Sequence, residues 1–181
     1  MQDVSIIEEL GIEMLQNPSE EDMHYMHLAV GYCNSSNDLS THNGAVLLSK
    51  DGQYVLAKNG IPEHWGIKAT RERLEQRPLK YNVIEHAENG SVFAAARSGI
   101  KTEGATVYCP WYACSRCAIA LVCSGVSRIV GHTGMLERTP DRWLEDVRLG
   151  FQMLQEAGVK TQAIDKHLDK CVFMNGDLVK L

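Results

Sequence analysis

The chain has 181 residues, of which 44% are hydrophobic and 23% are charged, a composition typical of a globular domain that excludes a disordered or fibrous protein. Its net charge of −5 has the wrong sign for general attraction to nucleic acid or to anionic membranes. The sequence has no apolar run long enough to span a membrane, and residues 1–13 have acids where a signal peptide would have lysines. We therefore expect one cytoplasmic domain over residues 1–181.

The N-terminal part of the chain is predicted to be helical. Residues 4–15 place apolar side chains at helical spacing before an Asn-Pro break, so residues 1–18 are expected to form an N-terminal helical extension. A second helix is predicted over residues 20–32, because Ser19 and Asp22 resemble a capping box and apolar side chains recur along one face.

A hairpin followed by alternating helices and strands is predicted for the rest of the chain. Residues 44–49 and 53–57 are expected to be antiparallel strands joined by an Asp-Gly turn. The helices expected after them are 86–97, 114–123 and 141–157, and the strands are 105–109, 127–130 and 159–164. Because strands separated by helices lie parallel, the pattern predicts an α/β fold with three α/β/α layers and a mixed central sheet of roughly five strands. Residues 171–181 contain an Asn-Gly turn and are expected to form a small hairpin.

A metal site is predicted where two of these helices begin. Cys114 and Cys117 lie three residues apart at a predicted helix start, so both sulfurs project from one face where the helix dipole favours thiolates. His86 lies at the start of an earlier helix, and such helix starts can converge at one edge of a sheet. Three protein ligands on Zn²⁺ leave a fourth position for water, as in catalytic sites. The alternative is that the two cysteines are buried thiols of a core-facing helix.

Glu88 is the candidate acid–base group of this site. It lies two residues after His86, which keeps its carboxylate near the metal without requiring it as a ligand. Zinc lowers the pKa of a bound water toward neutrality. A neighbouring carboxylate can then take a proton from that water, pass it to a ring nitrogen and protonate a departing amine.

The combination of His-x-Glu with Cys-x-x-Cys resembles the signature of the zinc-dependent cytidine and deoxycytidylate deaminase superfamily. The resemblance extends over about residues 23–159 and looks closest to the deoxycytidylate (dCMP) branch. The stretches that carry it are 37–41, 44–46, 59–62, 80–88, 104–108, 114–117 and 124–126. It implies a cytidine deaminase-like fold, zinc on His86, Cys114 and Cys117, Glu88 as proton shuttle, and conversion of dCMP to dUMP with release of ammonia.

The resemblance also implies substrate contacts and an assembly. Asn59 is expected to hydrogen-bond the sugar, and the backbone N–H of Ala87 to meet the pyrimidine carbonyl. Tyr112 is close enough to the first zinc cysteine to stack on the base, with a core aromatic as the equal alternative. Ser40 and Thr41 are candidates for the substrate phosphate, with simple turn formation as the alternative. The superfamily generally forms homo-oligomers, from dimers to hexamers.

Two positions depart from the family pattern, and one basic segment is open to two interpretations. Ala113 stands where the family has a proline, which ligates nothing. Lys58 stands where regulated dCMP deaminases have an aromatic associated with effector binding, so the sequence does not predict feedback by dCTP and dTTP. The basic segment 68–80 is interpreted as a solvated or subunit-contact helix rather than as a phosphate contact.

Other functions stay open from the sequence. The same chemistry could act on cytidine, cytosine, guanine or an adenosine of transfer RNA. The excess of acidic over basic residues disfavours the RNA substrate. A structural zinc module, with Cys109, Cys123 or His132 as a fourth ligand, would leave Glu88 without a role. A thiol redox pair would leave His86 unexplained. The cysteines outside the predicted metal site are interpreted as buried small apolar residues: Cys33, Cys109, Cys123 and Cys171.

Overall fold

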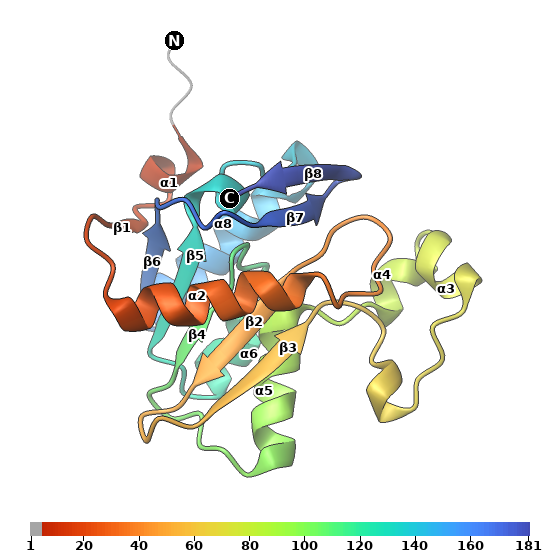
Figure 1. Ribbon diagram of the computed structural model, residues 1–181, viewed down its shortest axis with the longest axis horizontal. Coiled ribbons are helices and arrows are strands. Elements are labelled where there is room, and N and C mark those ends of the chain that lie inside the picture. The colour runs from red at the N-terminus through yellow and green to blue at the C-terminus, as the bar shows by residue number, and fades with distance from the viewer. Residues whose placement is uncertain (1–4) are drawn as a thin grey trace.

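A mixed β-sheet runs through the centre of the computed structural model, which describes residues 5–181 (Figure 1). Its six strands are hydrogen-bonded in the order β1-β6-β5-β4-β2-β3, and two further strands form a separate sheet. The central strands are β1 (Glu13–Leu15), β2 (Gly44–Leu48), β3 (Tyr54–Lys58), β4 (Thr106–Tyr108), β5 (Arg128–His132) and β6 (Lys160–Ile164). The separate pair is β7 (Cys171–Met174) and β8 (Asp177–Lys180).

Strand direction in the central sheet follows from how the strands are connected. β4, β5 and β6 are parallel because helices connect each to the next, and β1 pairs with β6 in the same direction. β2 is antiparallel to both β3 and β4. This confirms the predicted mixed sheet and the predicted antiparallel hairpin of β2 and β3.

Helices and the C-terminal hairpin cover the two faces of the sheet. The helices are α1 (Ile6–Glu9), α2 (Glu20–Cys33), α3 (Arg71–Glu75), α4 (Leu79–Val83), α5 (Ala87–Ser98), α6 (Ser115–Cys123), α7 (Thr133–Leu136) and α8 (Asp141–Glu156), with a 3-10 turn at Glu63–Trp65. Side chains alternate along β2, so Val46 packs on the α2 and β7 side while Leu47 packs on the α5, α6 and α8 side (Figure 1). The three-layer α/β/α architecture is therefore confirmed.

The N-terminal segment differs from the prediction. Helix α1 covers only Ile6–Glu9, Gly11 then adopts a φ of +61°, and Glu13–Leu15 pair with β6 as an edge strand. The predicted helix over residues 4–15 is thus wrong beyond residue 9, and Val4 lies outside the described residues. The physical reason is that the exposed edge of β6 supplies backbone hydrogen-bond partners that compete with helix formation. The same strand makes the sheet six-stranded rather than roughly five-stranded.

Local signals at two other places are confirmed. Helix α2 begins at a reciprocal capping box of Ser19 and Asp22, as expected. The hairpin β7–β8 turns at Asn175 and Gly176, which have φ angles of +54° and +94°. Both values suit the tight turns that favour an Asn-Gly pair.

The remaining cysteines follow the prediction only in part. Cys33 and Cys109 are buried and free, as expected. Cys123 and Cys171 are exposed, because one lies in the last turn of α6 and the other begins an outer strand of the hairpin. Their interpretation as buried apolar residues is wrong.

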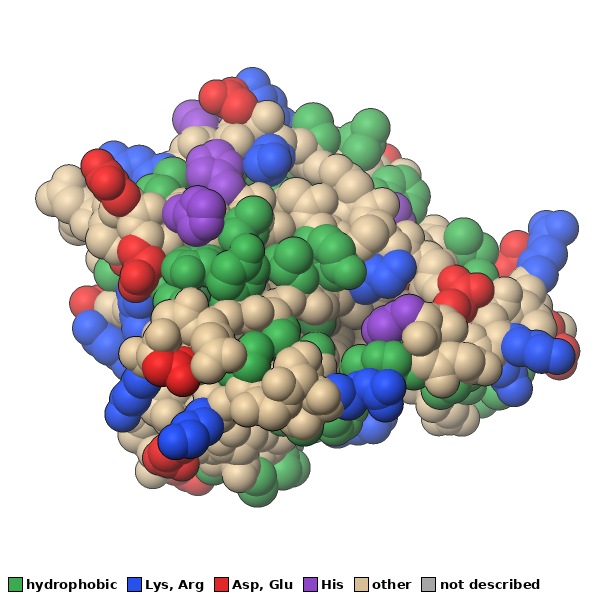
Figure 2. Space-filling view, turned by 60° about the horizontal axis from the view of Figure 1, so that its bottom comes forward, with side chains coloured by type: hydrophobic (Ala, Val, Ile, Leu, Met, Phe, Trp, Pro, Cys, Tyr) green, Lys and Arg blue, Asp and Glu red, His purple; other side chains and the backbone are tan. Residues whose placement is uncertain are grey.

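The described part of the chain lacks a helix that is both long and apolar enough to cross a membrane. On the face shown in Figure 2, basic and acidic side chains are interspersed rather than gathered into one basic surface.

Candidate active site

The first turns of α5 and α6 bring the predicted metal ligands together. His86 is the N-cap residue of α5, and Cys114 is the N-cap residue of α6. Cys117 lies in the first turn of α6, where it faces the same side as Cys114 because the two are three residues apart. We call these three residues the His-Cys-Cys cluster.

The distances within the His-Cys-Cys cluster suit a tetrahedral metal ion. Nδ1 of His86 lies 3.3 Å from Sγ of Cys114 and 3.4 Å from Sγ of Cys117. All three ligand atoms lie within 4.8 Å of one another. Sulfur and nitrogen ligands at normal bond lengths from tetrahedral zinc are roughly 3.5 Å apart. The soft thiolates and the imidazole are also the donor types that zinc prefers, so these residues could hold Zn²⁺.

Within residues 5–181, no fourth His, Cys, Asp or Glu joins this group. Cys109 instead accepts a hydrogen bond from the side-chain amide of Asn43 at 3.2 Å and donates one to the carbonyl of Trp111 at 3.3 Å. Cys123 is exposed at the other end of α6, and His132 is hydrogen-bonded to backbone groups through both ring nitrogens. Cys109 and His132 are therefore hydrogen-bonded to other groups, and Cys123 lies away from the cluster. The structure does not place any of these three residues as a fourth zinc ligand.

Glu88 is buried beside the cluster, with 3% of its surface exposed. Burial raises the pKa of its carboxyl group to about 7, against the opposing effect of a charge on His86. A hydrogen bond with Cys117 is the main cause that lowers the pKa of Cys114 to about 4, and the partner Cys117 has its pKa raised. The site therefore combines a readily formed thiolate with a carboxyl group suited to exchanging protons near neutral pH.

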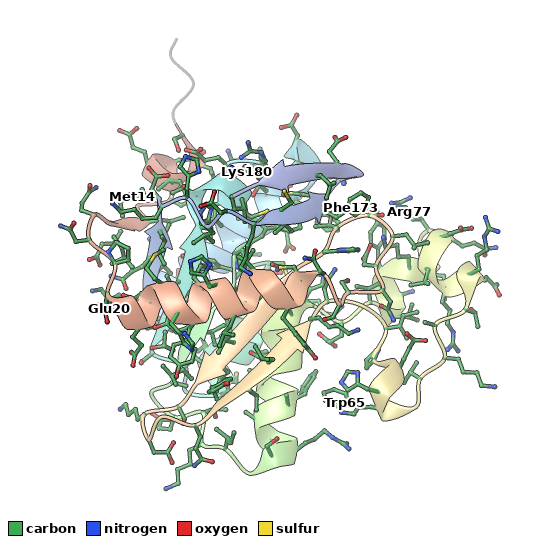
Figure 3. All side chains as sticks on the ribbon, in the orientation of Figure 1. Met14, Glu20, Trp65, Arg77, Phe173 and Lys180 are labelled. Carbon is green, nitrogen blue, oxygen red and sulfur yellow. The ribbon has the colours of Figure 1, made fainter. Side chains whose placement is uncertain are left out.

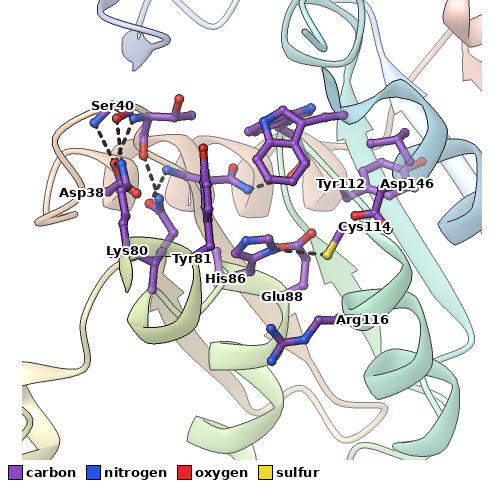
Figure 4. Close-up of a pocket in the computed structure, with 18 of the residues that line it drawn as sticks. Asp38, Ser40, Lys80, Tyr81, His86, Glu88, Tyr112, Cys114, Arg116 and Asp146 are labelled. Carbon is purple, nitrogen blue, oxygen red and sulfur yellow. Dashed lines mark hydrogen bonds and ion pairs between the residues drawn. The ribbon is translucent and has the colours of Figure 1, made fainter. Parts of the chain in front are cut away.

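A cavity of about 260 Å³ opens over this cluster (Figure 4). His86, Glu88 and Cys114 form its floor, and Ala87 contributes to the same wall. The predicted substrate residues also line it: Ser40, Thr41, Asn59 and Tyr112. All predicted site residues except Cys117 thus line one cavity, and Cys117 is buried with its sulfur 3.4 Å from Nδ1 of His86.

Asn59 is held in place by the backbone of the neighbouring loop. Its side-chain oxygen accepts a hydrogen bond from the N–H of Asn43 at 2.7 Å, and its amide donates to the carbonyl of Thr41 at 2.7 Å. An amide side chain has one further N–H and one further lone pair, which leaves Asn59 able to contact a ligand.

Tyr112 lies in the core, contrary to the stacking role considered for it. Only 2% of its surface is exposed, its ring packs 5.0 Å from that of Phe151, and its hydroxyl donates to the carbonyl of Gln162 at 2.8 Å. The ring is therefore not free to stack on a base. Tyr81 is the better-placed aromatic, since it is 42% exposed, lines the cavity and contacts Trp143 edge-to-face at 5.7 Å.

Lys80 is the exception within residues 68–80, which were interpreted as a solvated or subunit-contact helix. Most of this segment is exposed, and it contains the expected ion pair between Arg71 and Glu75. The segment forms two short helices, α3 and α4, and Lys80 is only 4% exposed. Its ammonium lies 2.7 Å from the carboxylate of Asp38 and donates to Ser40 Oγ at 2.7 Å (Figure 4). The partner carboxylate is distant in sequence, so local charge patterning could not identify this buried ion pair.

Among the cavity residues that the sequence did not predict, five follow the predicted site by many positions. They are Arg142, Trp143, Asp146, Val147 and Asn175. Four lie on the first turns of α8 and one lies at the tip of the β7–β8 hairpin. No motif marks them, and only their proximity in the fold reveals them.

Comparison with known proteins gives a match over the segment that contains the cluster. The model of the cytidine and deoxycytidylate deaminase zinc-binding region matches residues 19–133. A comparison with curated protein sequences finds no match.

Solved structures similar to this one include a dCMP deaminase. The enzyme from cyanophage S-TIM5 in complex with dCMP and dUMP has a TM-score of 0.63 and 22% identity, over 81% of this chain and 98% of that chain. Its apo form has a TM-score of 0.61 and 21% identity, over 82% and 99%. RibD from Acinetobacter baumannii, form 2, has a TM-score of 0.53 and 21% identity, over 80% of this chain and 35% of that chain. At these identities the similarity demonstrates a shared fold.

Proposed function

The chain belongs to the cytidine and deoxycytidylate deaminase zinc-binding family, and from that premise we propose that it converts dCMP to dUMP with release of ammonia. At the level of the superfamily it is a zinc-dependent deaminase. In the proposed site, His86, Cys114 and Cys117 hold Zn²⁺. When bound, the ion supplies Lewis-acid chemistry that lowers the pKa of water toward neutrality.

Glu88 is the proposed proton shuttle of the reaction. Its carboxylate takes one proton from the attacking water and transfers it to a ring nitrogen of the pyrimidine. It then takes the second proton from the newly attached hydroxyl group, which becomes the carbonyl, and gives it to the amine, which leaves as ammonia. A pKa of about 7 supports this role, because a group that must both accept and donate a proton works best near the ambient pH. Its burial beside the cluster leaves little of its surface in contact with bulk water.

Ala87 is proposed to orient the base. It is the first residue of α5, so its backbone N–H has no acceptor within the helix. The residue lines the cavity between His86 and Glu88. An N–H at this position can donate to the pyrimidine carbonyl and hold the ring with its amine-bearing carbon over the cluster.

The charge of the cavity is the observation that favours a nucleotide over a free base or a nucleoside. Lys80 is neutralised by Asp38, but Arg77, Arg116 and Arg142 also line the cavity. Across residues 5–181, none of these three arginines forms an ion pair, although the protein as a whole has a net charge of −5. The lining also contains the carboxylates of Glu88 and Asp146, so its four cationic side chains exceed its three carboxyl groups by one. Arginine binds phosphate strongly through paired N–H donors, so this local excess of positive charge suits a phosphate monoester.

A deamination assay across substrates tests the proposal. Loss of absorbance would be followed for cytosine, cytidine, deoxycytidine, CMP, dCMP and dCTP under identical conditions. We expect the highest kcat/KM for dCMP. Turnover of another amine-bearing base without turnover of dCMP would contradict the substrate assignment and leave the deaminase chemistry intact. A zinc-loaded protein inactive on every base would instead favour a structural zinc module.

We also propose that the chain forms a homo-oligomer, as its superfamily generally does. Sedimentation equilibrium of the zinc-loaded protein tests this, and a single species at the 20.2 kDa mass of one chain would contradict it.

A further inference from the structure

We propose that the C-terminal hairpin completes the substrate cavity, with Asn175 at its tip positioning Arg142 to bind the phosphate of the nucleotide. This inference rests on the proposed function and deepens it, because it names the residues that select a phosphorylated substrate. Both residues lie outside positions 19–133, where the deaminase family model matches. Selection for phosphate would thus come from a part of the chain that the family signature does not contain.

The hairpin is fixed to the loop that carries Ser40 and Thr41. Three hydrogen bonds join the two segments: His42 N–H to the Phe173 carbonyl at 2.7 Å, Asn175 N–H to Thr41 Oγ1 at 3.1 Å, and Gly176 N–H to the Ser40 carbonyl at 3.1 Å. Val172 and Met174 anchor the hairpin in the core on the α2 side of the sheet. Figure 3 shows Phe173 of the hairpin on the same side of the molecule as Arg77, which also lines the cavity.

The tip of the hairpin contacts the arginine on α8. Nη2 of Arg142 donates a hydrogen bond to the side-chain oxygen of Asn175 at 3.2 Å. Asn175 therefore contacts both Thr41 and Arg142, and all three residues line the cavity. This chain of contacts holds the guanidinium on the wall where the hydroxyl side chains of the loop lie.

The partner of Arg142 is neutral, which leaves its charge available to a ligand. On the same helix, Arg148 makes two hydrogen bonds to the carboxylate of Glu9, at 2.6 and 3.1 Å. Arg142 has no carboxylate partner among the ion pairs of residues 5–181. An amide fixes the direction of the guanidinium without neutralising it, and four of the five N–H donors remain for phosphate oxygens.

Ligand binding with and without the phosphate tests this arrangement. The affinities of zinc-loaded wild type, Arg142→Gln, Asn175→Gly and Arg148→Gln for dUMP and for deoxyuridine would be measured by calorimetry. Glycine is chosen because residue 175 has a positive φ that most side chains disfavour, so the substitution removes the amide and keeps the turn. Arg148→Gln removes the same charge from the same helix, outside the cavity.

We expect Arg142→Gln to weaken dUMP binding about 10- to 100-fold, which is the range for a lost hydrogen bond to a charged group. Asn175→Gly should weaken it about 3- to 10-fold, because the guanidinium remains but loses its orientation. Neither variant should change deoxyuridine binding more than about 2-fold, and Arg148→Gln should match wild type. In kinetics, Asn175→Gly should raise KM for dCMP without lowering kcat and should leave deoxycytidine unaffected.

Three results would overturn the inference. They are wild-type affinity of Arg142→Gln for dUMP, equal losses for dUMP and deoxyuridine, and no binding of dUMP by wild type. Failure of the proposed function is seen separately, as absence of dCMP turnover by wild type. The binding measurements decide the role of Arg142 and Asn175 in either case.

Discussion

The two halves of the cavity are built in different ways. The chemical half consists of His86, Glu88, Cys114 and Cys117, which all lie at the starts of two neighbouring helices, α5 and α6. The substrate half comes from five separate segments: the 38–41 loop, the turn after β3 that carries Asn59, α4, α8 and the β7–β8 hairpin. In the chemical half, helix geometry positions residues that are only two or three apart in the sequence. In the substrate half, ion pairs and hydrogen bonds between distant segments position the side chains. Changes in the first half should therefore abolish chemistry, and changes in the second should alter substrate binding or stability.

The largest expected effect is loss of the metal. Cys117→Ala removes one of three ligand atoms, so bound zinc should fall from about one ion per chain to near zero after dialysis, and deaminase activity should fall to background. Metal content by mass spectrometry and initial rates check this. Cys123→Ala is the matched control, since that exposed cysteine lies on the same helix outside the cluster. Full zinc content in Cys117→Ala would break the assignment of this ligand.

Removing the proposed proton shuttle should slow turnover strongly while leaving the metal in place. Glu88→Gln keeps the size of the side chain but cannot accept a proton, so kcat should fall by about 10²- to 10⁴-fold. Zinc content should remain that of wild type, because Glu88 is not part of the His-Cys-Cys cluster. Glu145→Gln, at an exposed position on α8, serves as control. An active Glu88→Gln enzyme would rule out the proposed role.

The buried ion pair should affect the substrate half of the cavity and stability together. Lys80→Met leaves the carboxylate of Asp38 buried without its cation, which should lower the free energy of unfolding by about 3 kcal/mol. KM for dCMP should also rise, because Ser40 loses its hydrogen-bond donor. Urea unfolding and steady-state kinetics measure the two effects. Adding Asp38→Asn should restore part of the stability, and a double variant as unstable as the sum of the single ones would contradict this coupling.

A smaller effect is expected from an ion pair that does not line the cavity. Asp22 of α2 lies 2.7 Å from Arg128 and accepts a hydrogen bond from the hydroxyl of Tyr108 at 2.9 Å. Burial alone would raise its pKa, but Arg128 and Tyr108 together lower it below the usual value near 3.9. The folded state therefore binds this proton more weakly than the unfolded state.

The stability supplied by Asp22 is complete above its usual pKa and is lost as pH falls through the lower folded value. Asp22→Asn should thus lower the free energy of unfolding by about 1–2 kcal/mol at pH 7, a cost that shrinks as pH falls below the usual Asp pKa and disappears below the lower folded value. Urea unfolding across this pH range measures it, with Asp177→Asn at an exposed hairpin position as control. Deaminase kinetics should be unchanged, in contrast to Lys80→Met. A cost independent of pH would contradict the ionic origin of the effect.

The sequence by itself determined most of the fold and the chemical half of the site. Apolar periodicity predicted α2, α5, α6, α8 and five of the six central strands. It could do so because an element that buries one face has apolar residues at the regular spacing of a helix or strand. Spacing also predicted the ligand set, since residues three apart on a helix face the same way. The capping box at Ser19 and the Asn-Gly turn at residue 175 were equally local signals, and the structure confirms both.

Only the tertiary structure decided which distant residues complete the cavity and which strand extends the sheet. Strand β1 forms because the edge of β6 accepts it, which no pattern within residues 4–15 reveals. Lys80 is buried in an ion pair with Asp38, and Arg142 lines the cavity in contact with Asn175. In both pairs the two residues are far apart in the chain. Such partners are determined by side-chain packing and by the need of a buried charge for an opposite charge or a hydrogen bond. These interactions depend on distance in space rather than on distance in sequence.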